Sequence, residues 1–119
     1  MNRYLNRLIA LFLACSFPLS ASAGQWQFSG VERIVAVSDI HGAYDAMVDT
    51  LQNAEVLDAD LGWSGETTHL VIVGDILDRG PDSREAMDLL MRLEQEAEAA
   101  GGMVHVLIGN HEAMNLVGD

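Results

Sequence analysis

Three short apolar runs, each followed by a polar turn, constrain this chain more than any other feature. The runs cover residues 31–37, 69–73 and 103–108, and their β-branched residues predict buried β-strands. Between the runs, residues 43–54 and 82–100 carry apolar side chains at helical spacing. The predicted order is therefore β-α-β-α-β, an α/β fold with parallel strands.

Some residues in these elements have local structural interpretations. Asp82 followed by Glu85 predicts a capping box at the start of the second helix. His69 and His105 lie within predicted strands and are interpreted as structural histidines. Trp63, in the loop between the first helix and the second strand, either packs over the sheet edge or lines a cleft.

Each predicted strand is followed by side chains that can bind metals or phosphates. They are Asp39 and His41 after the first strand, Asp75, Asp78 and Arg79 after the second, and Asn110 and His111 after the third. In open α/β sheets the carboxyl ends of the strands form the ligand-binding edge. Any one of these acids alone could be a helix cap or a turn residue. Three clusters at one edge instead predict a common site.

The residue types favour a transition-metal centre. Asp39 and His41 offer a carboxylate oxygen beside an imidazole nitrogen, a set that suits Zn, Fe or Mn better than Ca or Mg. Asp75 can offer one oxygen to each of two ions, and Asn110 adds a neutral oxygen. Two ions at such a site can hold a phosphoryl oxygen and lower the pKa of a bridging water.

These residues also carry a resemblance to a known family, through three motifs that occur in order: Asp39-x-His41-Gly42, Gly74-Asp75-x-x-Asp78-Arg79-Gly80 and Gly109-Asn110-His111-Glu112. The chain from residue 34 to residue 119 resembles the calcineurin-like metallophosphoesterases of the phosphoprotein phosphatase type. It is most similar to their bacterial Shewanella-like branch. The resemblance implies the first half of an α-β-β-α sandwich.

The same resemblance implies the metal ligands and the ions. Asp39 and His41 would bind one ion, Asp75 would bridge, and Asn110 would bind the second. The ions would be Mn, Fe or Zn, divalent or trivalent. Ser38 stands where protein phosphatases usually have glycine, which is a departure from the pattern.

The resemblance further implies a reaction. A metal-bound hydroxide would attack phosphorus directly, with His111 as the general acid for the leaving oxygen. Asp78 would hold the tautomer of His111, and Arg79 would bind phosphate oxygens. The substrate would be a protein phosphorylated on serine, threonine or tyrosine, or alternatively a dinucleotide polyphosphate or another small phosphate ester.

Composition limits the partners. The chain has 6 basic and 18 acidic residues, a formal net charge of −12, and no lysine. Such an acidic chain is a poor partner for nucleic acid or an anionic membrane. It also repels a phosphate substrate at long range, so bound metals and Arg79 would have to supply the local positive field.

The pattern of residues 1–23 is typical of a targeting segment. Arg3 and Arg7 precede an apolar run over residues 8–17, and Ala21-Ser22-Ala23 offers a signal-peptidase site. We interpret residues 1–23 as a secretory signal and residues 24–119 as the N-terminal part of a metallophosphoesterase domain. The protein is then expected outside the cytoplasm, in the periplasm or secreted, without stable membrane insertion.

Three alternatives concern the two ends of the chain. The first segment could be an uncleaved anchor or a buried helix, and Cys15 could mark a lipoprotein cleavage box. The family site also needs later histidines and another arginine, which residues up to Asp119 do not provide. We therefore expect residues 24–119 alone to bind metal weakly and to hydrolyse phosphate esters near background. A non-catalytic remnant is the alternative function.

The signal interpretation predicts cleavage after Ala23. The intact mass of the exported protein, measured by mass spectrometry, should correspond to a chain that begins at Gly24. A chain that keeps Met1 and stays in the membrane fraction would contradict it.

Overall fold

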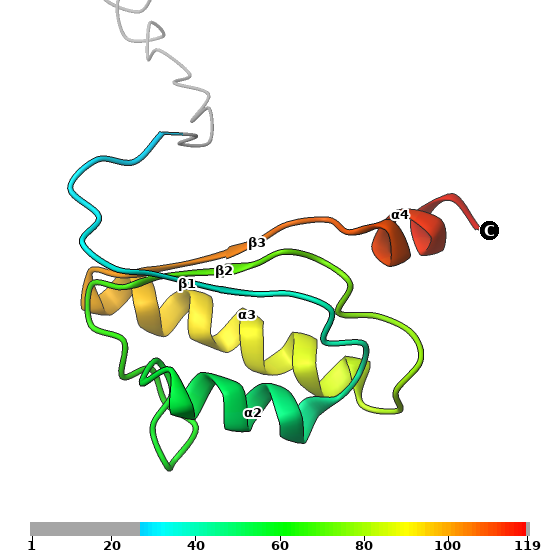
Figure 1. The fold of residues 1–119 in the computed structure, drawn as a ribbon, viewed down its shortest axis with the longest axis horizontal. Coiled ribbons are helices and arrows are strands. Elements are labelled where there is room, and N and C mark those ends of the chain that lie inside the picture. The colour runs from blue at the N-terminus through cyan, green and yellow to red at the C-terminus, as the bar shows by residue number, and fades with distance from the viewer. Residues whose placement is uncertain (1–26, 119) are drawn as a thin grey trace, which may run out of the picture.

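The computed structural model describes residues 27–118, so the predicted signal segment lies outside the described part of the chain. The elements, in order, are β1 (Ile34–Val37), α2 (Tyr44–Asn53), β2 (His69–Ile72), α3 (Ser83–Ala100), β3 (Met103–Val106) and α4 (Asn110–Val117), as labelled in Figure 1. Within residues 27–118, no helix is both long enough and apolar enough to cross a membrane.

The three strands form one parallel sheet in the order β1-β2-β3, which confirms the predicted α/β arrangement. Ile34, His69 and Met103 are partners across the three strands, so the strands start level and also end level. Helices α2 and α3 lie on one side of the sheet, and α4 lies beyond its carboxyl end (Figure 1). This arrangement brings the three loops that follow the strands to one edge.

The core lies between the sheet and the two helices. Leu70 and Ile72 of β2 are fully buried, as are Leu51 of α2 and Leu93 of α3. Side chains alternate along a strand, so the intervening residue Val71 points to the opposite face. Burying four such aliphatic side chains removes apolar area from water, which is the main favourable contribution to folding.

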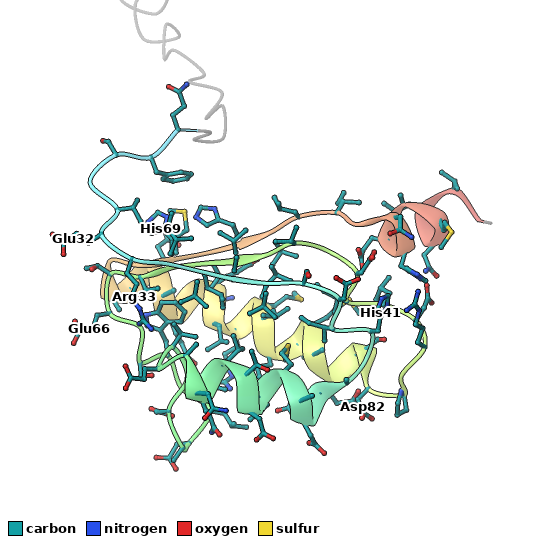
Figure 2. The ribbon with its side chains drawn as sticks, viewed as in Figure 1. Glu32, Arg33, His41, Glu66, His69 and Asp82 are labelled. Atoms are coloured by element: carbon teal, nitrogen blue, oxygen red, sulfur yellow. The ribbon has the colours of Figure 1, made fainter. Side chains whose placement is uncertain are left out.

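The opposite face of the sheet is more exposed and carries a pair of histidines. His69 Nδ1 lies 3.0 Å from His105 Nε2, and the ring of Phe28 meets both imidazoles edge-on. Burial, followed by the neighbouring His69, lowers the pKa of His105. Ile34 on this face is 65% exposed. His69 lies at the end of the sheet away from His41 (Figure 2), so the pair is separate from the strand-end loops.

The structure differs from the sequence prediction in several details. Each strand is shorter than its apolar run, because the outer residues extend beyond the paired ladder. Trp63 packs against the core and donates its indole N–H to Glu66 O at 3.0 Å. The capping box predicted at Asp82 is wrong, because Asp82 makes no side-chain cap bond. Its backbone N–H instead bonds Gly42 O at 3.1 Å, which fixes the residue in a loop contact.

Helix α4 was not predicted. It begins after Gly109 and ends at Gly118, whose φ of 80° is the left-handed conformation that closes many helices. The sequence signal for the start of this helix is Glu112, three residues after Gly109. The Glu112 side chain accepts a hydrogen bond from the backbone N–H of Gly109 at 2.9 Å. The helix matters because it carries Asn110 and His111 in its first turn.

The core predicts a contrast in stability between two neighbouring residues of α3. Leu93→Ala should lower the free energy of unfolding by about 2–5 kcal/mol, because it removes a fully buried side chain and leaves a cavity. Met91→Ala, at a position that is 62% exposed, is the matched control and should change it by about 0.5 kcal/mol or less. Urea unfolding followed by circular dichroism measures both, and equal effects would contradict the placement of the core.

Candidate active site

Backbone hydrogen bonds join the loop after β1 to the loop after β2. His41 N–H donates to Asp75 O at 2.9 Å, and Gly42 N–H donates to Ile76 O at 2.9 Å. Gly80 N–H returns to His41 O at 2.8 Å. The two loops therefore run side by side as one layer, with the residues that follow each strand in contact.

Two glycines are required by how closely these loops approach. A Cβ atom on Gly80 would collide with the backbone of His41 and Gly42. A Cβ atom on Gly109 would collide with the carboxylate and backbone nitrogen of Asp75. Gly80 thus allows the loop after β2 to pack on the loop after β1, and Gly109 allows the segment after β3 to pack directly on Asp75.

The carboxylate of Glu112 ties the third loop to the second. Its Oε2 accepts from Asp75 N–H at 2.7 Å and from Gly109 N–H at 2.9 Å. Its Oε1 accepts from Ile76 N–H at 2.8 Å and from Leu77 N–H at 3.1 Å. Burial by itself would raise the pKa of Glu112, but these four backbone bonds to the charged form outweigh it and lower the pKa.

The backbone of the site is strained. Within residues 27–118, five of the eight non-glycine residues with positive φ belong to the predicted site: Asp39, His41, Asp75, Asp78 and Arg79. Aspartate and histidine enter the left-handed region more often than other non-glycine residues, whereas arginine, here Arg79 with a φ of 67°, adopts it rarely. Such residues persist only where surrounding contacts fix them, and they concentrate at functional sites. The loop bonds to His41 and Glu112 are those contacts.

His41 is poised to offer one nitrogen to a cation. Its Nδ1 lies 2.9 Å from Leu77 O, so Nδ1 carries the proton and donates it, and Nε2 keeps a lone pair. That Nε2 lies 3.6 Å from Asp39 Oδ1. Two ligand atoms that are each about 2.1 Å from one ion lie about 3–4 Å apart. Ser38 Oγ holds the other oxygen of Asp39 at 2.7 Å.

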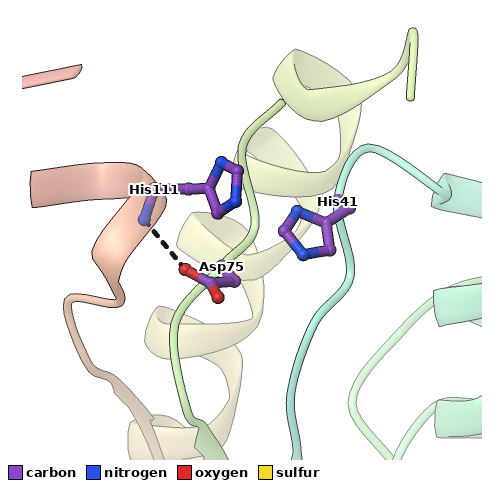
Figure 3. A group of neighbouring side chains, drawn as sticks. All are labelled: His41, Asp75 and His111. Carbon is purple, nitrogen blue, oxygen red and sulfur yellow. Dashed lines mark hydrogen bonds between the residues drawn. The ribbon is translucent and has the colours of Figure 1, made fainter. Parts of the chain in front are cut away.

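Asp75 lies between the other ligand candidates. Its Oδ1 accepts from His111 N–H at 3.0 Å, a bond drawn in Figure 3. The side-chain amide of Asn110 lies against the same carboxylate. With its nitrogen turned inward, Asn110 donates to Asp75 Oδ2 at 2.9 Å. With its oxygen turned inward, Asn110 places an amide oxygen next to the carboxylate oxygens of Asp75, and a cation bound between them could contact both groups.

His41, Asp75 and His111 converge on one point from the loop after β1, the loop after β2 and the first turn of α4 (Figure 3). One ligand atom from each lies within 4.8 Å of the other two, and the two imidazole rings are 4.7 Å apart. Imidazole and carboxylate ligands suit Zn, Fe and Mn. The residues present therefore fit the metals that the sequence predicted.

His111 also belongs to a second chain of contacts. Its Nδ1 lies 2.9 Å from Asp78 Oδ2, and its Nε2 lies 3.4 Å from a guanidinium nitrogen of Arg79. The bond from His111, the largest cause, lowers the pKa of Asp78. An ionised Asp78 accepts a hydrogen bond from Nδ1–H of His111, so the other ring nitrogen, Nε2, faces the site. Asp78 and Arg79 themselves are exposed, which leaves them accessible to a ligand.

The structure thus gathers all seven predicted site residues at one edge of the sheet. The prediction that Asp39 and His41 lie side by side agrees with their 3.6 Å separation. Two further residues had no predicted role. Glu112 was part of a motif, but three of its four backbone partners lie more than thirty residues away. Asn115, which contacts Asp78, lies in the helix that was not predicted.

Comparison with known proteins places this geometry in a family. Residues 32–118 match the family model described as calcineurin-like phosphoesterase, and the chain therefore belongs to that family. Within it, the chain is 40% identical over 95 residues to Shewanella-like protein phosphatase 2 of Arabidopsis thaliana. It is 39% identical over 77 residues to an asymmetrical bis(5'-nucleosyl)-tetraphosphatase of Bacillus velezensis, a match that covers 63% of this chain and 28% of that one. The predicted resemblance to the Shewanella-like phosphatases is confirmed.

Solved structures agree with this assignment. A cold-active protein-tyrosine phosphatase of a psychrophilic Shewanella superposes with a TM-score of 0.71 at 44% identity, over 73% of this chain and 26% of that one. A point-mutant form of a cold-active protein tyrosine phosphatase gives a TM-score of 0.74 at 43% identity, over 76% of this chain and 27% of that one. The Arabidopsis match covers 80% of this chain and 24% of its relative. The chain thus spans about a quarter of the length of the proteins it matches.

The Glu112 bonds predict a loss of stability on substitution. Glu112→Gln keeps the shape but turns an NH₂ group toward N–H donors, so about two backbone donors lose their acceptor. We expect the free energy of unfolding to fall by about 2–6 kcal/mol, at about 1–3 kcal/mol for each unpaired donor. Glu98→Gln, at an exposed position of α3, is the control and should stay within about 0.5 kcal/mol.

The same carboxylate predicts a pH dependence. Because folding lowers the pKa of Glu112, its contribution is complete above the unfolded value of about 4.3. The contribution is lost as the pH falls from there through the folded pKa, since the unfolded chain takes up the proton first. Urea unfolding between pH 7 and pH 3 should show a smaller acid-side loss in Glu112→Gln than in the unchanged protein. Identical pH profiles would contradict the assigned role.

Proposed function

We propose that the protein is a metal-dependent phosphoric monoester hydrolase that acts on phosphorylated proteins. The supporting observation is the convergence of three segments that follow the strands: the loops after β1 and β2 and the first turn of α4. They bring His41, Asp75 and His111 within 4.8 Å of one another, beside the His111–Asp78 pair and Arg79. Family membership makes phosphoester hydrolysis the reaction class.

Two metal ions are part of this proposal. Asp39 and His41 would hold one, Asn110 would hold the other, and Asp75 would contribute to both. When bound, such ions supply Lewis acidity that polarises the phosphoryl group and lowers the pKa of the attacking water. The surrounding hydrogen bonds set the ligands in advance, because Leu77 O fixes the His41 tautomer.

The remaining side chains would handle the phosphate and the leaving group. Arg79 presents a planar fork of N–H donors that matches two phosphate oxygens. In turning to a phosphate it would leave His111 Nε2, which it now approaches at 3.4 Å. His111 could then carry a proton on Nε2 and pass it to the leaving oxygen, while Asp78 keeps Nδ1 protonated and stabilises the imidazolium.

The relatives support the substrate class. The matched structures bear the name protein-tyrosine phosphatase, and the Arabidopsis relative is a protein phosphatase. We therefore propose phosphotyrosine, phosphoserine or phosphothreonine in a protein. The second candidate is a dinucleotide polyphosphate, which is favoured by the identity with the Bacillus tetraphosphatase. We further propose that the protein works after export, on the basis of the predicted signal in residues 1–23.

The proposal predicts that metal binding and acid catalysis separate. In the active, metal-loaded protein, Asp75→Asn should lose metal and activity together, because one carboxylate serves both ions. His111→Asn should keep the metal and lose activity by about 10²–10⁴-fold, the contribution of a general acid. Metal analysis of the purified protein and hydrolysis of p-nitrophenyl phosphate measure the two properties.

An exposed aspartate of α2 provides the control for charge removal. Asp49→Asn should change neither metal content nor hydrolysis. If His111→Asn loses metal as fully as Asp75→Asn, then His111 is a ligand, as its position within the His41–Asp75–His111 group would also allow, and the acid role is wrong.

A further inference from the structure

Helix α4 carries a second polar side chain toward the loop after β2. Asn115 lies one turn beyond His111, and residues four apart share a helix face. Its Nδ2 donates to Asp78 Oδ2 at 2.9 Å and to the backbone oxygen of His111 at 2.9 Å. One amide therefore links the helix backbone at His111 to the carboxylate that pairs with the His111 ring.

Asp78 depends on these contacts for its orientation. Its side chain is 43% exposed and its backbone has a φ of 67°, so neither burial nor a regular element fixes it. Among residues 27–118, two side chains bond its carboxylate: His111 through Nδ1 and Asn115 through Nδ2. Both donate to the same oxygen, Oδ2. An exposed carboxylate with one partner can rotate, whereas two donors from one rigid helix hold it.

Asparagine is also an unfavourable choice for the helix itself. It lies low in helix propensity, well below leucine, because its side chain competes for backbone hydrogen bonds. Position 115 is exposed, so packing does not require this residue. Asn115 is thus a poor helix former at an exposed helical position, and its side chain bonds the carboxylate of Asp78. This combination points to a role in the site.

We propose that Asn115 is a positioning residue for the proposed acid–base pair: it holds Asp78 so that His111 keeps its proton on Nδ1 and directs Nε2 to the reacting phosphate ester. The proposal rests on the function proposed above, in which His111 protonates the leaving oxygen. Within residues 27–118 the amide of Asn115 bonds Asp78 and the backbone oxygen of His111, and it bonds none of the proposed metal ligands Asp39, His41, Asp75 and Asn110. We therefore expect its effect to pass through Asp78.

The first test reads the tautomer of His111 and does not depend on activity. The chain has four histidines, so His111→Asn identifies the His111 signals in a ¹H–¹⁵N imidazole spectrum recorded at pH 8. The unchanged protein should show His111 as the Nδ1–H tautomer. Asn115→Leu keeps the helix but removes the donor, and it should show a mixture with the Nε2–H tautomer. Leu116→Ala, on the same helix and 75% exposed, should leave the spectrum unchanged.

The second test uses leaving groups of different basicity, with the metal-loaded protein. A poor leaving group such as phenol needs the general acid, whereas p-nitrophenol needs it less. Asn115→Leu should lower kcat for phenyl phosphate by about 10–100-fold, as for other residues that orient a ligand, and should lower it less for p-nitrophenyl phosphate. KM and metal content should stay the same. Asn115→Gln, which retains the amide, should restore part of the loss.

A double variant tests the route through Asp78. If Asn115 acts only through Asp78, then Asn115→Leu should add little to the loss caused by Asp78→Asn. An unchanged His111 tautomer in Asn115→Leu, or equal losses on both esters, would overturn the proposal, since the latter indicates a purely structural role. A shifted tautomer in a protein that hydrolyses neither ester would confirm the positioning and reject the proposed function.

Discussion

The site depends on one carboxylate that accepts four backbone hydrogen bonds. Strand-end loops at the edge of a three-stranded sheet have little apolar area to bury, and much of the site is open to solvent. Without Glu112, the amides of residues 75–77 would lack a partner other than water. With it, the loop after β2 is fixed to the first turn of α4. His41 then joins the same layer through backbone bonds to Asp75 and Gly80.

This fixed backbone allows an already acidic protein to hold several carboxylates close together at the site. The chain carries a net charge of −12, yet Asp39 lies 3.6 Å from His41, and Asp75 and Asp78 both bond His111. Backbone amides stabilise the charged carboxylate of Glu112, and the side chains of His111 and Asn115 stabilise that of Asp78. Asp39 and Asp75 face imidazole and amide groups that are typical metal ligands. The electrostatics of the site therefore favour a cation. Within the site, a phosphate would meet positive charge at such a cation and at Arg79.

The sequence was sufficient for much of the fold, and the failures have physical causes. Periodicity predicted three strands and two helices, because burial on one face imposes the pattern that the sheet and α2 and α3 show. Helix α4 was missed because Gly109 has no capping side chain. Asp82 was assigned a cap bond that a loop contact to Gly42 replaces. The ligand candidates were predicted from strand ends, whereas the roles of Glu112 and Asn115 depend on partners more than thirty residues away.

Because the strands lie in the sheet in chain order, β1-β2-β3, they can pair in the order in which they are synthesised. β1, α2 and β2 can pair and bury Leu51, Leu70 and Ile72 while the later residues are still being made. We expect Asp39, His41 and Asp75 to come together at that stage, whereas the loop amides at 75–77 have no carboxylate to bind until Glu112 is made. Glu112 comes about forty residues after β2 begins, so the geometry of the metal-ligand candidates is completed last. We therefore expect the enclosed core to act as the template for the candidate site, whose geometry is fixed once α4 has formed.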